Sequence, residues 1–599
     1  MTHATDSRGM QWMTLSVCAA LVCAVSLVAG ARPAEAGINV WTSLGPPGGS
    51  VQALAADPTT PTTLYAGTGG AGVYKIEQVS AHTYTAMPPV TVSGASPFAA
   101  CTADARAGQS FVPNSEFEPL IAVNPIDPMN IVGLWEQDRW LDGAGARGQV
   151  IGVSFDRGMS WESVVVPGLS ICSGGAQYSA DPWLSFAPNG DLYHIAYTYL
   201  EPPVEPGTRF AVLVNKSTDG GRTWSVPVAL NEAVYPALNN TPSITADPRD
   251  PRSVYAAWSL AEDTHVAFLG PALFSHSSDG GESWDAPRVL YRPTPGSVTA
   301  SPQIIVLPDG TLLNVFTEVT SATRRYLSVQ RSTDGGATWL PDGPPIHAFS
   351  YRGIIVVVPT TEVLLLTAGD PSIALDRASG ALYAAWQGGA QAKVNFSTST
   401  DGGLTWSAPV VIAKTPANTD ARLTQSFLPA IHVARDGTVG VTYYDFRNDT
   451  ADASVLTDTW FIWCQPAQVD CAHAESWTGE VRLTPTSLDL TTAPHVYGLF
   501  LGNHVGLASD GDDFLALFPQ SSAEDASSMY FVRLAAVPCA GDCNTDGEVT
   551  VDELLSMVNV ALGNTDVAVC VAGDANGDAG ITVDEILSAV NNALQGCAA

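Results

Sequence analysis

Short runs in which apolar and polar residues alternate dominate the chain between residues 110 and 535. Two runs of this kind commonly flank Asn-Gly or Asp-Gly, as in DPWLSFAPNGDLYHIAY (181–197) and SPQIIVLPDGTLLNVF (301–316). Alternation with a period of two indicates a β-strand, and these dipeptides favour tight hairpin turns. Such hairpins begin at prolines that recur roughly every 60 residues: Pro119, Pro182, Pro242, Pro302, Pro371 and Pro429. The pattern therefore predicts a repeated antiparallel unit.

A second motif, Ser-x-Asp-x-Gly-x-x-Trp, follows five of these hairpins. The copies are Ser154–Trp161, Ser217–Trp224, Ser277–Trp284, Ser332–Trp339 and Ser399–Trp406. We expect the Asp carboxylate to accept hydrogen bonds from turn N–H groups, and the Ser hydroxyl to bond back across the turn. The Gly supplies a positive φ, and the Trp ring packs between sheets. This Asp box is therefore predicted to be structural and not catalytic.

One repeat holds an inner hairpin and an outer hairpin closed by the box. Four antiparallel strands per repeat, arranged radially, are typical of a β-propeller. The fold class is thus mainly β, and the repeat count gives seven blades, with six as the alternative. In the count of seven, the last blade has strands at 505–519 and 529–535 and takes its outer strand from 84–92.

The boxes also indicate which face of the ring to search for a site. They fall on the same face as the turns of the inner hairpins, so the opposite face carries residues before each repeat proline and residues after each second strand. The first set is Glu118, Asp181, Thr241, Ser301, Asp370 and Leu428. The second set is 136–139, 262–263, Glu318 and 445–449. This face mixes carboxylates with two arginines.

The N-terminus has the pattern of an export signal. Arg8 precedes an apolar run from 15 to 30, and Ala34-Glu35-Ala36 offers a small-x-small cleavage pattern. We expect a secreted, extracellular or cell-surface protein of bacterial type, with no membrane span after the signal is removed. The predicted domains are the signal peptide (1–36), a β-hairpin extension (37–80), the Asp-box propeller (81–535) and a small C-terminal module (536–599).

Cysteine content and charge agree with export. Of ten cysteines, Cys18 and Cys23 lie in the signal, and the even number that remains suggests disulfides. Cys464 and Cys471 form a plausible local pair. The formal net charge of −33 argues against a nucleic-acid partner, because phosphates require a basic surface.

The C-terminal module contains two patterns of a calcium loop, with oxygen ligands at positions 1, 3 and 5 and a Glu at position 12. The predicted Ca²⁺ ligands are Asp542, Asn544, Asp546, Glu548 and Glu553 in the first loop, and Asp574, Asn576, Asp578, Gly580 and Glu585 in the second. Ala579 stands in the second loop where Gly normally makes the turn. Apolar residues at helical spacing follow each loop, which predicts a helix after each.

These motifs resemble two known families. The Asp boxes, with WEQDRW (135–140), GVTYYDFRND (440–449) and GLFLGNHVGLAS (498–509), resemble bacterial exo-α-sialidase-like proteins of the sialidase superfamily. Paired loop–helix units without entering helices are similar to dockerin type I modules rather than to full EF-hands. The second resemblance implies a cohesin-like scaffold as partner, and a calcium-stabilised tail of other purpose is its alternative.

Sialidases bind the substrate carboxylate with arginines and use an Asp as acid/base and a Tyr as nucleophile. The resemblance therefore implies catalytic roles for Asp138, Arg139, Tyr444, Asp445 and Arg447, with Tyr497 as an alternative nucleophile. The Phe/Tyr-Arg-Ile-Pro motif usual in that superfamily is absent. Two functions stay open: a secreted glycoside hydrolase that acts on terminal acidic sugars, and a non-catalytic propeller that binds a glycan, a glycoprotein or another protein.

Overall fold

The structure is a computed structural model of the 599-residue chain. It describes residues 51–56, 63–68, 72–77, 82–103, 110–141, 145–200, 207–261, 270–321, 324–352, 356–359, 363–365, 369–389, 391–450, 454–477, 479–495, 498–521, 525–544, 549–574 and 580–595. The predicted signal peptide lies outside these residues, and so do Tyr497, Asp546, Glu548, Asn576 and Asp578.

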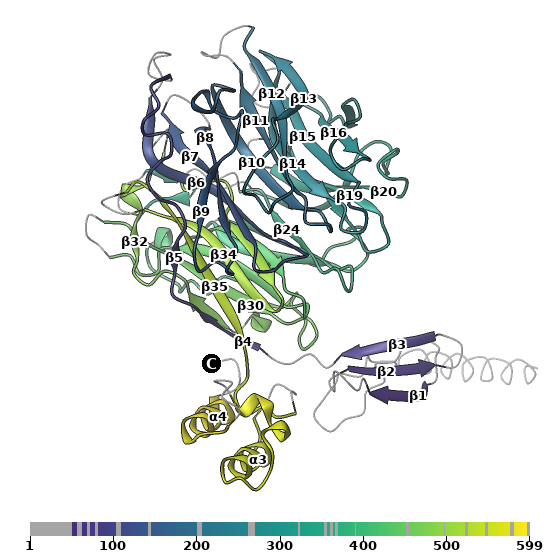
Figure 1. Ribbon diagram of the computed structural model, residues 1–599, viewed down its shortest axis with the longest axis vertical. Coiled ribbons are helices and arrows are strands. Elements are labelled where there is room, and N and C mark those ends of the chain that lie inside the picture. Colours follow the sequence, from purple (N-terminus) through teal and green to yellow (C-terminus); the bar gives the residue numbers. More distant parts are fainter. Residues whose placement is uncertain are drawn as a thin grey trace, which may run out of the picture. The chain divides into compact units, whose positions relative to one another are not determined.

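The chain divides into two compact units, Met1–Val79 and Ser80–Ala599. The first unit contains one antiparallel sheet of β1 (Val51–Ala56), β2 (Thr63–Thr68) and β3 (Gly72–Glu77), in that order (Figure 1). The sequence predicted a hairpin here, and the structure adds a third strand.

The second unit is mainly β and begins its repeats at residue 111. The first group is β6 (Phe111–Val123), β7 (Ile131–Trp140), β8 (Ala146–Ser154) and β9 (Glu162–Val165). The second is β10 (Tyr178–Phe186), β11 (Leu192–Tyr199), β12 (Arg209–Ser217) and β13 (Val228–Val234). Within each group every strand pairs antiparallel with the next, and a contact between Ser179 and Ala146 joins β10 to β8.

Similar antiparallel sheets follow along the chain. One holds β14 (Leu238–Ala246), β15 (Val254–Ala261), β16 (Ala272–Ser277) and β17 (Arg288–Tyr291). The next holds β18 (Val298–Val306), β19 (Leu312–Ser321), β20 (Arg324–Ser332) and β21 (Ile346–Tyr351). A short pair, β22 (Val356–Val357) and β23 (Leu364–Leu365), precedes β24 (Ser372–Leu375), β25 (Leu382–Gly388), β26 (Lys393–Ser399) and β27 (Val410–Val411).

Two further sheets complete the β region. The first contains β28 (Ser426–Val433), β29 (Val439–Asp445), β30 (Leu456–Cys464) and β31 (Glu480–Arg482), with β32 (Leu488–Asp489) also paired to β30. The last contains β33 (Gly506–Asp510), β34 (Asp513–Gln520) and β35 (Ser528–Pro538), together with β4 (His82–Ala86) and β5 (Val90–Thr91). The prediction that 84–92 pairs with the last strand is confirmed (Figure 1).

The hydrophobic cores lie between successive sheets. Ile195 of β11 and Trp258 of β15 share one core, and Ile431 of β28 and Phe396 of β26 share another. The last sheet packs against the first in the same way, because Leu517 and Phe531 lie with Trp135 of β7. The sheets therefore follow one another around a closed ring, as in a propeller.

The Asp boxes have the predicted structural role. In the second box, Asp219 Oδ1 accepts the Thr223 N–H at 2.9 Å and the Ser217 hydroxyl at 2.8 Å. Trp224 Nε1 donates to the Gly221 carbonyl at 2.9 Å. The Ser–Asp bond and the turn N–H bond recur in the other four boxes.

The boxes lie on the predicted face of the ring. Asn130, in the turn between β6 and β7, donates through Nδ2 to the Ser154 carbonyl of its own repeat and to the Gly220 carbonyl of the next, both at 3.1 Å. Inner-hairpin turns and boxes therefore share one face. The opposite face carries the ends of the strands where a site was expected.

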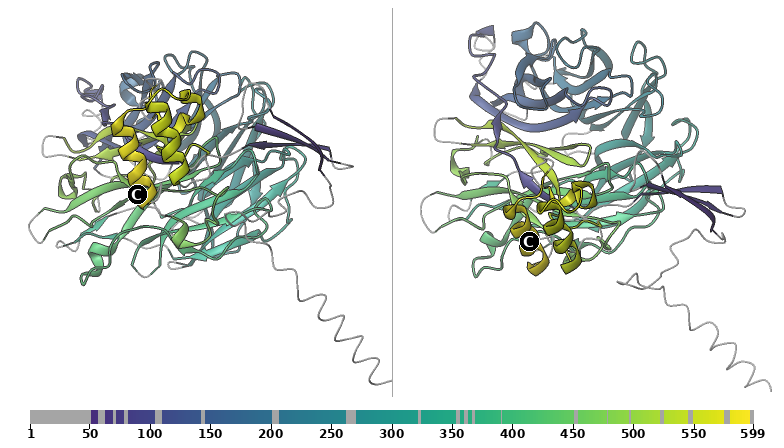
Figure 2. Two further views of the ribbon diagram at one scale, coloured as in Figure 1. Left: turned by 90° about the horizontal axis from the view of Figure 1, so that it is seen from below. Right: turned by 60° about the horizontal axis from the view of Figure 1, so that its bottom comes forward.

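The C-terminal module contains α3 (Val551–Ala561) and α4 (Val583–Gln595), which lie side by side (Figures 1 and 2). A disulfide joins Cys543 to Cys570 beneath the two helices' shared core, which contains Met557 and Ala589. Two further disulfides, Cys101–Cys172 and the predicted Cys464–Cys471, lie in the β region. Among the described helices, none combines the length and apolar character that a membrane crossing needs.

Candidate functional site: an acidic group at the centre of the ring

The residue before the repeat proline sits in a β-bulge of the innermost strand. Five of these residues have left-handed backbone conformations: Glu118 (φ 55°), Asp181 (φ 49°), Thr241 (φ 45°), Ser301 (φ 50°) and Leu428 (φ 52°). The strand register shifts at each of these positions. A positive φ is costly for residues other than Gly, so its recurrence at one point of the repeat marks a position held by its surroundings.

Hydrogen bonds link these bulges around the ring. The Asp181 N–H donates to Glu136 Oε1 at 2.7 Å, and the Thr241 N–H donates to Asp181 Oδ2 at 3.0 Å. The Ser301 N–H then donates to Thr241 Oγ1 at 3.0 Å, and the Ser301 hydroxyl to Asp370 Oδ2 at 2.7 Å. The bulges at Asp181, Thr241 and Ser301 thus each present the backbone N–H to a side chain of the preceding sheet.

Three carboxylates meet in this ring. Glu118 of β6, Glu136 of β7 and Asp181 of β10 can each offer an oxygen such that all three oxygens lie within 4.8 Å of one another. Glu118 and Glu136 are 2% and 1% exposed, whereas Asp181 is partly exposed. We call these three residues the central acidic group.

Burial changes the protonation of the group. Burial first, and then the charges of Glu118 and Asp181, raise the pKa of Glu136 well above its usual range. Burial and the Glu118 charge likewise raise the pKa of Asp181 to about 8. At neutral pH the group therefore retains protons, as closely spaced carboxyl groups do when they cannot all ionise.

Arg139 lies beside the central acidic group. Its guanidinium carbon is 3.9 Å from the ring centroid of Phe500 and 5.0 Å from that of Phe117. Burial lowers its pKa, and the charges of Glu136 and Glu118 oppose that change. Within the described part of the chain, Arg139 Nε and Glu136 Oε2 are buried without hydrogen-bond partners. A guanidinium nitrogen and a carboxyl oxygen beside the central acidic group thus have no protein partner among the described residues.

A loop from the last sheet covers Glu118. Asn503 donates to Glu118 Oε1 through Nδ2 at 2.6 Å and through its backbone N–H at 3.2 Å. Gly502 permits this approach because a Cβ at its φ of 122° would lie 2.6 Å from the Glu118 nitrogen. Asn503 and His504 line a pocket of about 60 Å³ with Asp181 and Trp183. Asp181 is thus the member of the central acidic group that lines this small pocket.

Two tyrosines lie near the group from β11. Burial raises the pKa of Tyr197 well above its usual range, and the nearby charges of Asp181 and Glu136 add to this effect. Burial also raises the pKa of Tyr199 to about 12. A phenolate is therefore unfavourable at either position, which disfavours a tyrosine nucleophile.

The five predicted catalytic residues do not form one site. Arg139 borders the central acidic group, but its neighbour Asp138 faces away from it. Asp138 Oδ2 accepts the Ser96 hydroxyl at 2.7 Å, and Oδ1 accepts the Asn114 N–H at 3.0 Å. The φ of 61° at Asp138 interrupts the alternation of side chains along β7. The expectation that Asp138 and Arg139 act together is corrected for this reason.

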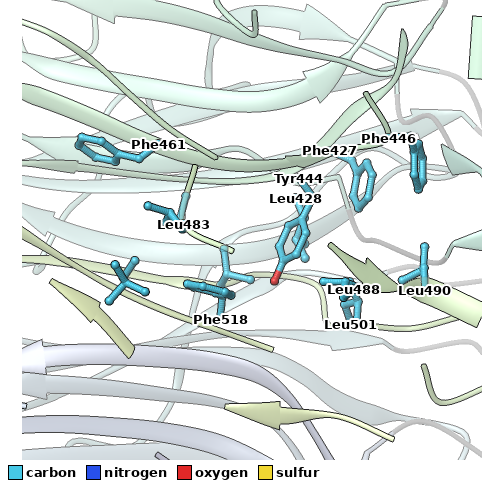
Figure 3. Packing of buried hydrophobic residues seen from close by; sticks show 14 of the residues in the cluster. Phe427, Leu428, Tyr444, Phe446, Phe461, Leu483, Leu488, Leu490, Leu501 and Phe518 are labelled. Atoms are coloured by element: carbon cyan, nitrogen blue, oxygen red, sulfur yellow. The ribbon is translucent and has the colours of Figure 1, made fainter. Parts of the chain in front are cut away.

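Tyr444 belongs to the hydrophobic core and not to a reactive surface. It is fully buried, and its ring lies 5.8 Å from that of Phe427 and 6.5 Å from that of Phe518 (Figure 3). Its hydroxyl donates to the Pro519 carbonyl at 2.8 Å. The structure therefore contradicts a role as an accessible nucleophile.

Asp445 and Arg447 form a separate polar network with Glu480. Arg447 Nε donates to Asp445 Oδ2 at 2.7 Å, and Nη2 donates to Glu480 Oε1 at 2.9 Å. The guanidinium carbon lies 3.7 Å from the Trp460 ring centroid. Burial alone would lower the Arg447 pKa, but the bonds to Glu480 raise it. These contacts commit Arg447 to Asp445 and Glu480, and its role in binding a substrate stays a prediction.

The sequence did contain a signal for the central acidic group. Glu118 and Asp181 precede repeat prolines, and Glu136 was expected just after a second strand, which are the two positions on the searched face. The structure has Glu136 within that strand, β7 (Ile131–Trp140). The hydrophobic pattern could not predict the direction in which each side chain points, because the β-bulges change that direction.

The predicted calcium loops are described in part. Glu553 Oε2 accepts the Thr550 N–H at 2.7 Å, and Oε1 accepts the Asn544 N–H at 3.1 Å. Glu585 Oε2 accepts the Thr582 N–H at 2.7 Å in the same manner. Of the predicted ligands, Asp542, Glu553 and Glu585 are buried. Asp574 and Gly580 of the second loop are also among the residues that the structure describes. Buried carboxylates fit a cation, and Ca²⁺ at these loops stays a prediction.

Comparison with known proteins gives structural likeness at low identity. No protein-family model matches the chain, and no curated protein matches it. Three similar solved structures are the Hadza microbial sialidase Hz136, the α-L-arabinofuranosidase Arb93A of Fusarium graminearum and a mutant of Trypanosoma rangeli sialidase. The first has 14% identity and a TM-score of 0.40, covering 67% of this chain and 76% of its own. The second has 12% identity and a TM-score of 0.35, and the match covers 77% of this chain and 98% of the arabinofuranosidase. The third has 15% identity and a TM-score of 0.38, and the match covers 65% of this chain and 57% of the sialidase mutant.

Proposed function

We propose that this chain is an extracellular, sialidase-like glycoside hydrolase whose reaction takes place at the central acidic group. The observation that carries the proposal is the meeting of Glu118, Glu136 and Asp181 within 4.8 Å, beside Arg139 and a pocket. Glycoside hydrolysis commonly needs one protonated and one ionised carboxyl group at the scissile bond. We also propose that the ring has seven blades, because the sheets succeed one another in that number and β4 completes the last.

The two kinds of carboxyl group have distinct roles in this proposal. Asp181 lines the pocket and has a raised pKa, so it holds the proton that the leaving oxygen requires. Glu118 is the second carboxyl group of the pair, and it accepts hydrogen bonds from Asn503. Carboxyl groups about 5 Å apart are typical of retaining enzymes, and wider spacings of inverting ones. The reaction is therefore expected to retain the anomeric configuration.

Arg139 supports a preference for acidic sugars. A guanidinium binds a carboxylate through two parallel hydrogen bonds, and Nε of Arg139 has no partner among the described residues. The sequence resemblance to exo-α-sialidase-like proteins points to the same substrate class.

The test is turnover of fluorogenic glycosides by the full chain. An α-sialoside, a β-glucuronide and a neutral α-L-arabinofuranoside would be compared for wild type and for Asp181→Asn and Glu118→Gln. We expect turnover of an acidic glycoside, reduced at least a hundredfold in both variants. Glu282→Gln, which changes an exposed carboxylate, is the matched control. Turnover that persists in both variants would place the reaction elsewhere.

A non-catalytic propeller that binds a glycan or protein is the second candidate. The observation that favours it is the pocket volume of about 60 Å³, since sites for small ligands usually span about 300 Å³ or more. Binding of a glycan array without turnover of any glycoside would support this candidate over hydrolysis.

We further propose that the C-terminal module binds Ca²⁺ and docks to a cohesin-like scaffold protein. Its support is a pair of matching exposed apolar rows. On α3 and its C-cap, Val551, Leu555 and Leu562 are 72%, 58% and 70% exposed. On α4, Val583, Leu587 and Leu594 occupy the same helical spacing and are 69%, 58% and 78% exposed. The helix periodicity seen in the sequence thus includes surface rows, and exposed apolar rows are typical of partner surfaces.

A further inference from the structure

A second cavity lies at the end of the innermost strands, beyond the repeat prolines. Its volume is about 620 Å³, and it is lined by Ile304 of β18, Ile373 of β24, His432 of β28 and Ser509 of β33, with Arg377 from the β24–β25 turn. These strands come from successive sheets, so the cavity lies at the centre of the ring on the face of the Asp boxes. We infer that this cavity is a binding site for a small organic anion that carries a carboxylate, with Arg377 as its anchor.

Arg377 provides an uncommitted positive charge. Within the described part of the chain it makes no hydrogen bond or ion pair, although solvent reaches it. Surrounding protein atoms lower its pKa, and the charge of Asp247 opposes this change. Arg377 is an exposed residue on the rim of the cavity, and a guanidinium without a partner can bind a carboxylate through two parallel hydrogen bonds.

The neighbouring carboxylates are occupied by other groups. Asp247 accepts the Arg249 N–H at 2.9 Å and the Tyr255 hydroxyl at 3.2 Å. Asp376 accepts the Ala378 N–H at 2.8 Å and the Ser379 hydroxyl. Neither carboxylate is bonded to Arg377, so the charge of Arg377 remains directed to the cavity that it lines.

His432 adds a neutral polar group on the same cavity. Burial, and secondly the charge of Arg377, lower its pKa to about 4. Its imidazole is therefore neutral at pH 7 and adds no repulsion to Arg377. The other cation at the cavity, Arg435, pairs with Asp512 at 3.3 Å and is largely exposed. Arg377 is thus the natural contact for a carboxylate, with His432 as an additional hydrogen-bond donor or acceptor.

Cavity size and surroundings limit the ligand class. A volume of about 620 Å³ lies within the range of small-molecule sites, and its isoleucine and alanine walls suit the apolar face of a compact organic molecule. The chain as a whole carries −33, so general electrostatics repels anions. Binding must therefore depend on the local contacts. This site is separate from the central acidic group and does not depend on the proposed function.

The experiment is calorimetric titration of the full chain with D-glucuronate. Inorganic phosphate tests whether any oxyanion suffices, and glucose tests the need for a negative charge. We expect saturable binding of glucuronate, no binding of glucose, and an affinity at least tenfold weaker in Arg377→Met. Arg252→Met, which removes a 75% exposed arginine, should bind like wild type and controls for net charge.

Two outcomes would overturn the inference. One is an unchanged affinity in Arg377→Met that retains the wild-type melting temperature. The other is loss of binding in Asp181→Asn with normal binding in Arg377→Met, which would assign the anion to the central acidic group. Phosphate binding with the same dependence on Arg377 would support the site and widen its ligand class. Absence of any anion binding up to millimolar concentration would refute the site.

Discussion

At the scale of single residues, buried ionisable groups determine how this protein should respond to pH. Burial raises the pKa of Asp181 and of Glu116 to about 8. In the Asp boxes, hydrogen bonds from Ser283 and Thr338 lower the pKa of Asp279 and of Asp334 to about 2. The two classes act in different pH ranges, because the first titrates above the unfolded value of about 4 and the second below it.

The first prediction concerns stability between pH 4 and pH 8. Asp181 and Glu116 have folded pKa values above their unfolded ones, so their contribution is fully present below pH 4 and lost as the pH rises to about 8. The melting temperature should therefore fall across this range. Asp181→Asn and Glu116→Gln should each make the fall shallower, by on the order of 2 °C at pH 8. Equal slopes in wild type and both variants would contradict the assigned burial.

The second prediction concerns Arg447. Arg447→Met leaves Glu480 and the buried Asp445 without their cation, so it should cost about 3 kcal/mol of unfolding free energy. Turnover per folded molecule should not change, because Arg447 lies in a network separate from the central acidic group. Chemical denaturation gives the first quantity and an active-fraction assay the second. If Arg447→Met is stable but has lost turnover, Arg447 belongs to the catalytic site.

At the scale of elements, local patterns predicted what local contacts determine. The hairpins and Asp boxes were predictable because each is held by bonds within a few residues, such as Thr223 to Asp219. The partner of the last strand was predictable by counting strands. Side-chain direction was not, because the positive φ at Asp138 and the core packing at Tyr444 depend on residues far along the chain.

The third prediction concerns β4 and β5. A chain that begins at residue 93 lacks both strands and exposes the edge of β35. Unpaired strand edges promote association, so this chain should melt at a lower temperature and aggregate at lower concentration. A chain that begins at residue 80 keeps both strands and is the control. Light scattering and thermal melts distinguish them, and identical behaviour would mean that β35 needs no partner.

At the scale of the whole molecule, the chain joins a large ring to a small helical module with its own core and disulfide. The ring could be predicted as a propeller because the same unit repeats many times. The central acidic group could be predicted only as positions on one face. The loop that covers Glu118 lies within GLFLGNHVGLAS (498–509), which carried the family resemblance, but its sequence did not indicate the contact with Glu118.

The fourth prediction concerns calcium in the module. Calorimetry of the full chain should show calcium binding that Glu553→Gln weakens by at least tenfold, because the position-12 carboxylate supplies two oxygens. Glu585→Gln should affect only the second site. A chelator should lower the melting temperature of the module and leave that of the ring unchanged. A titration identical in wild type and Glu553→Gln would refute the assignment of the first loop.

Closure of the ring by distant strands has a consequence for biogenesis. The Met529 N–H bonds to Ser93 Oγ across 436 residues, and β35 is among the last β-structure to be synthesised. Until β35 emerges, β4 and β5 have no partner strand and the first sheet lacks one of its packing neighbours. Contacts of such long sequence separation form slowly and leave edges open while they form. The nascent chain is therefore most vulnerable to misassembly just before its synthesis ends, and a chaperone that binds extended segments would help most at that stage.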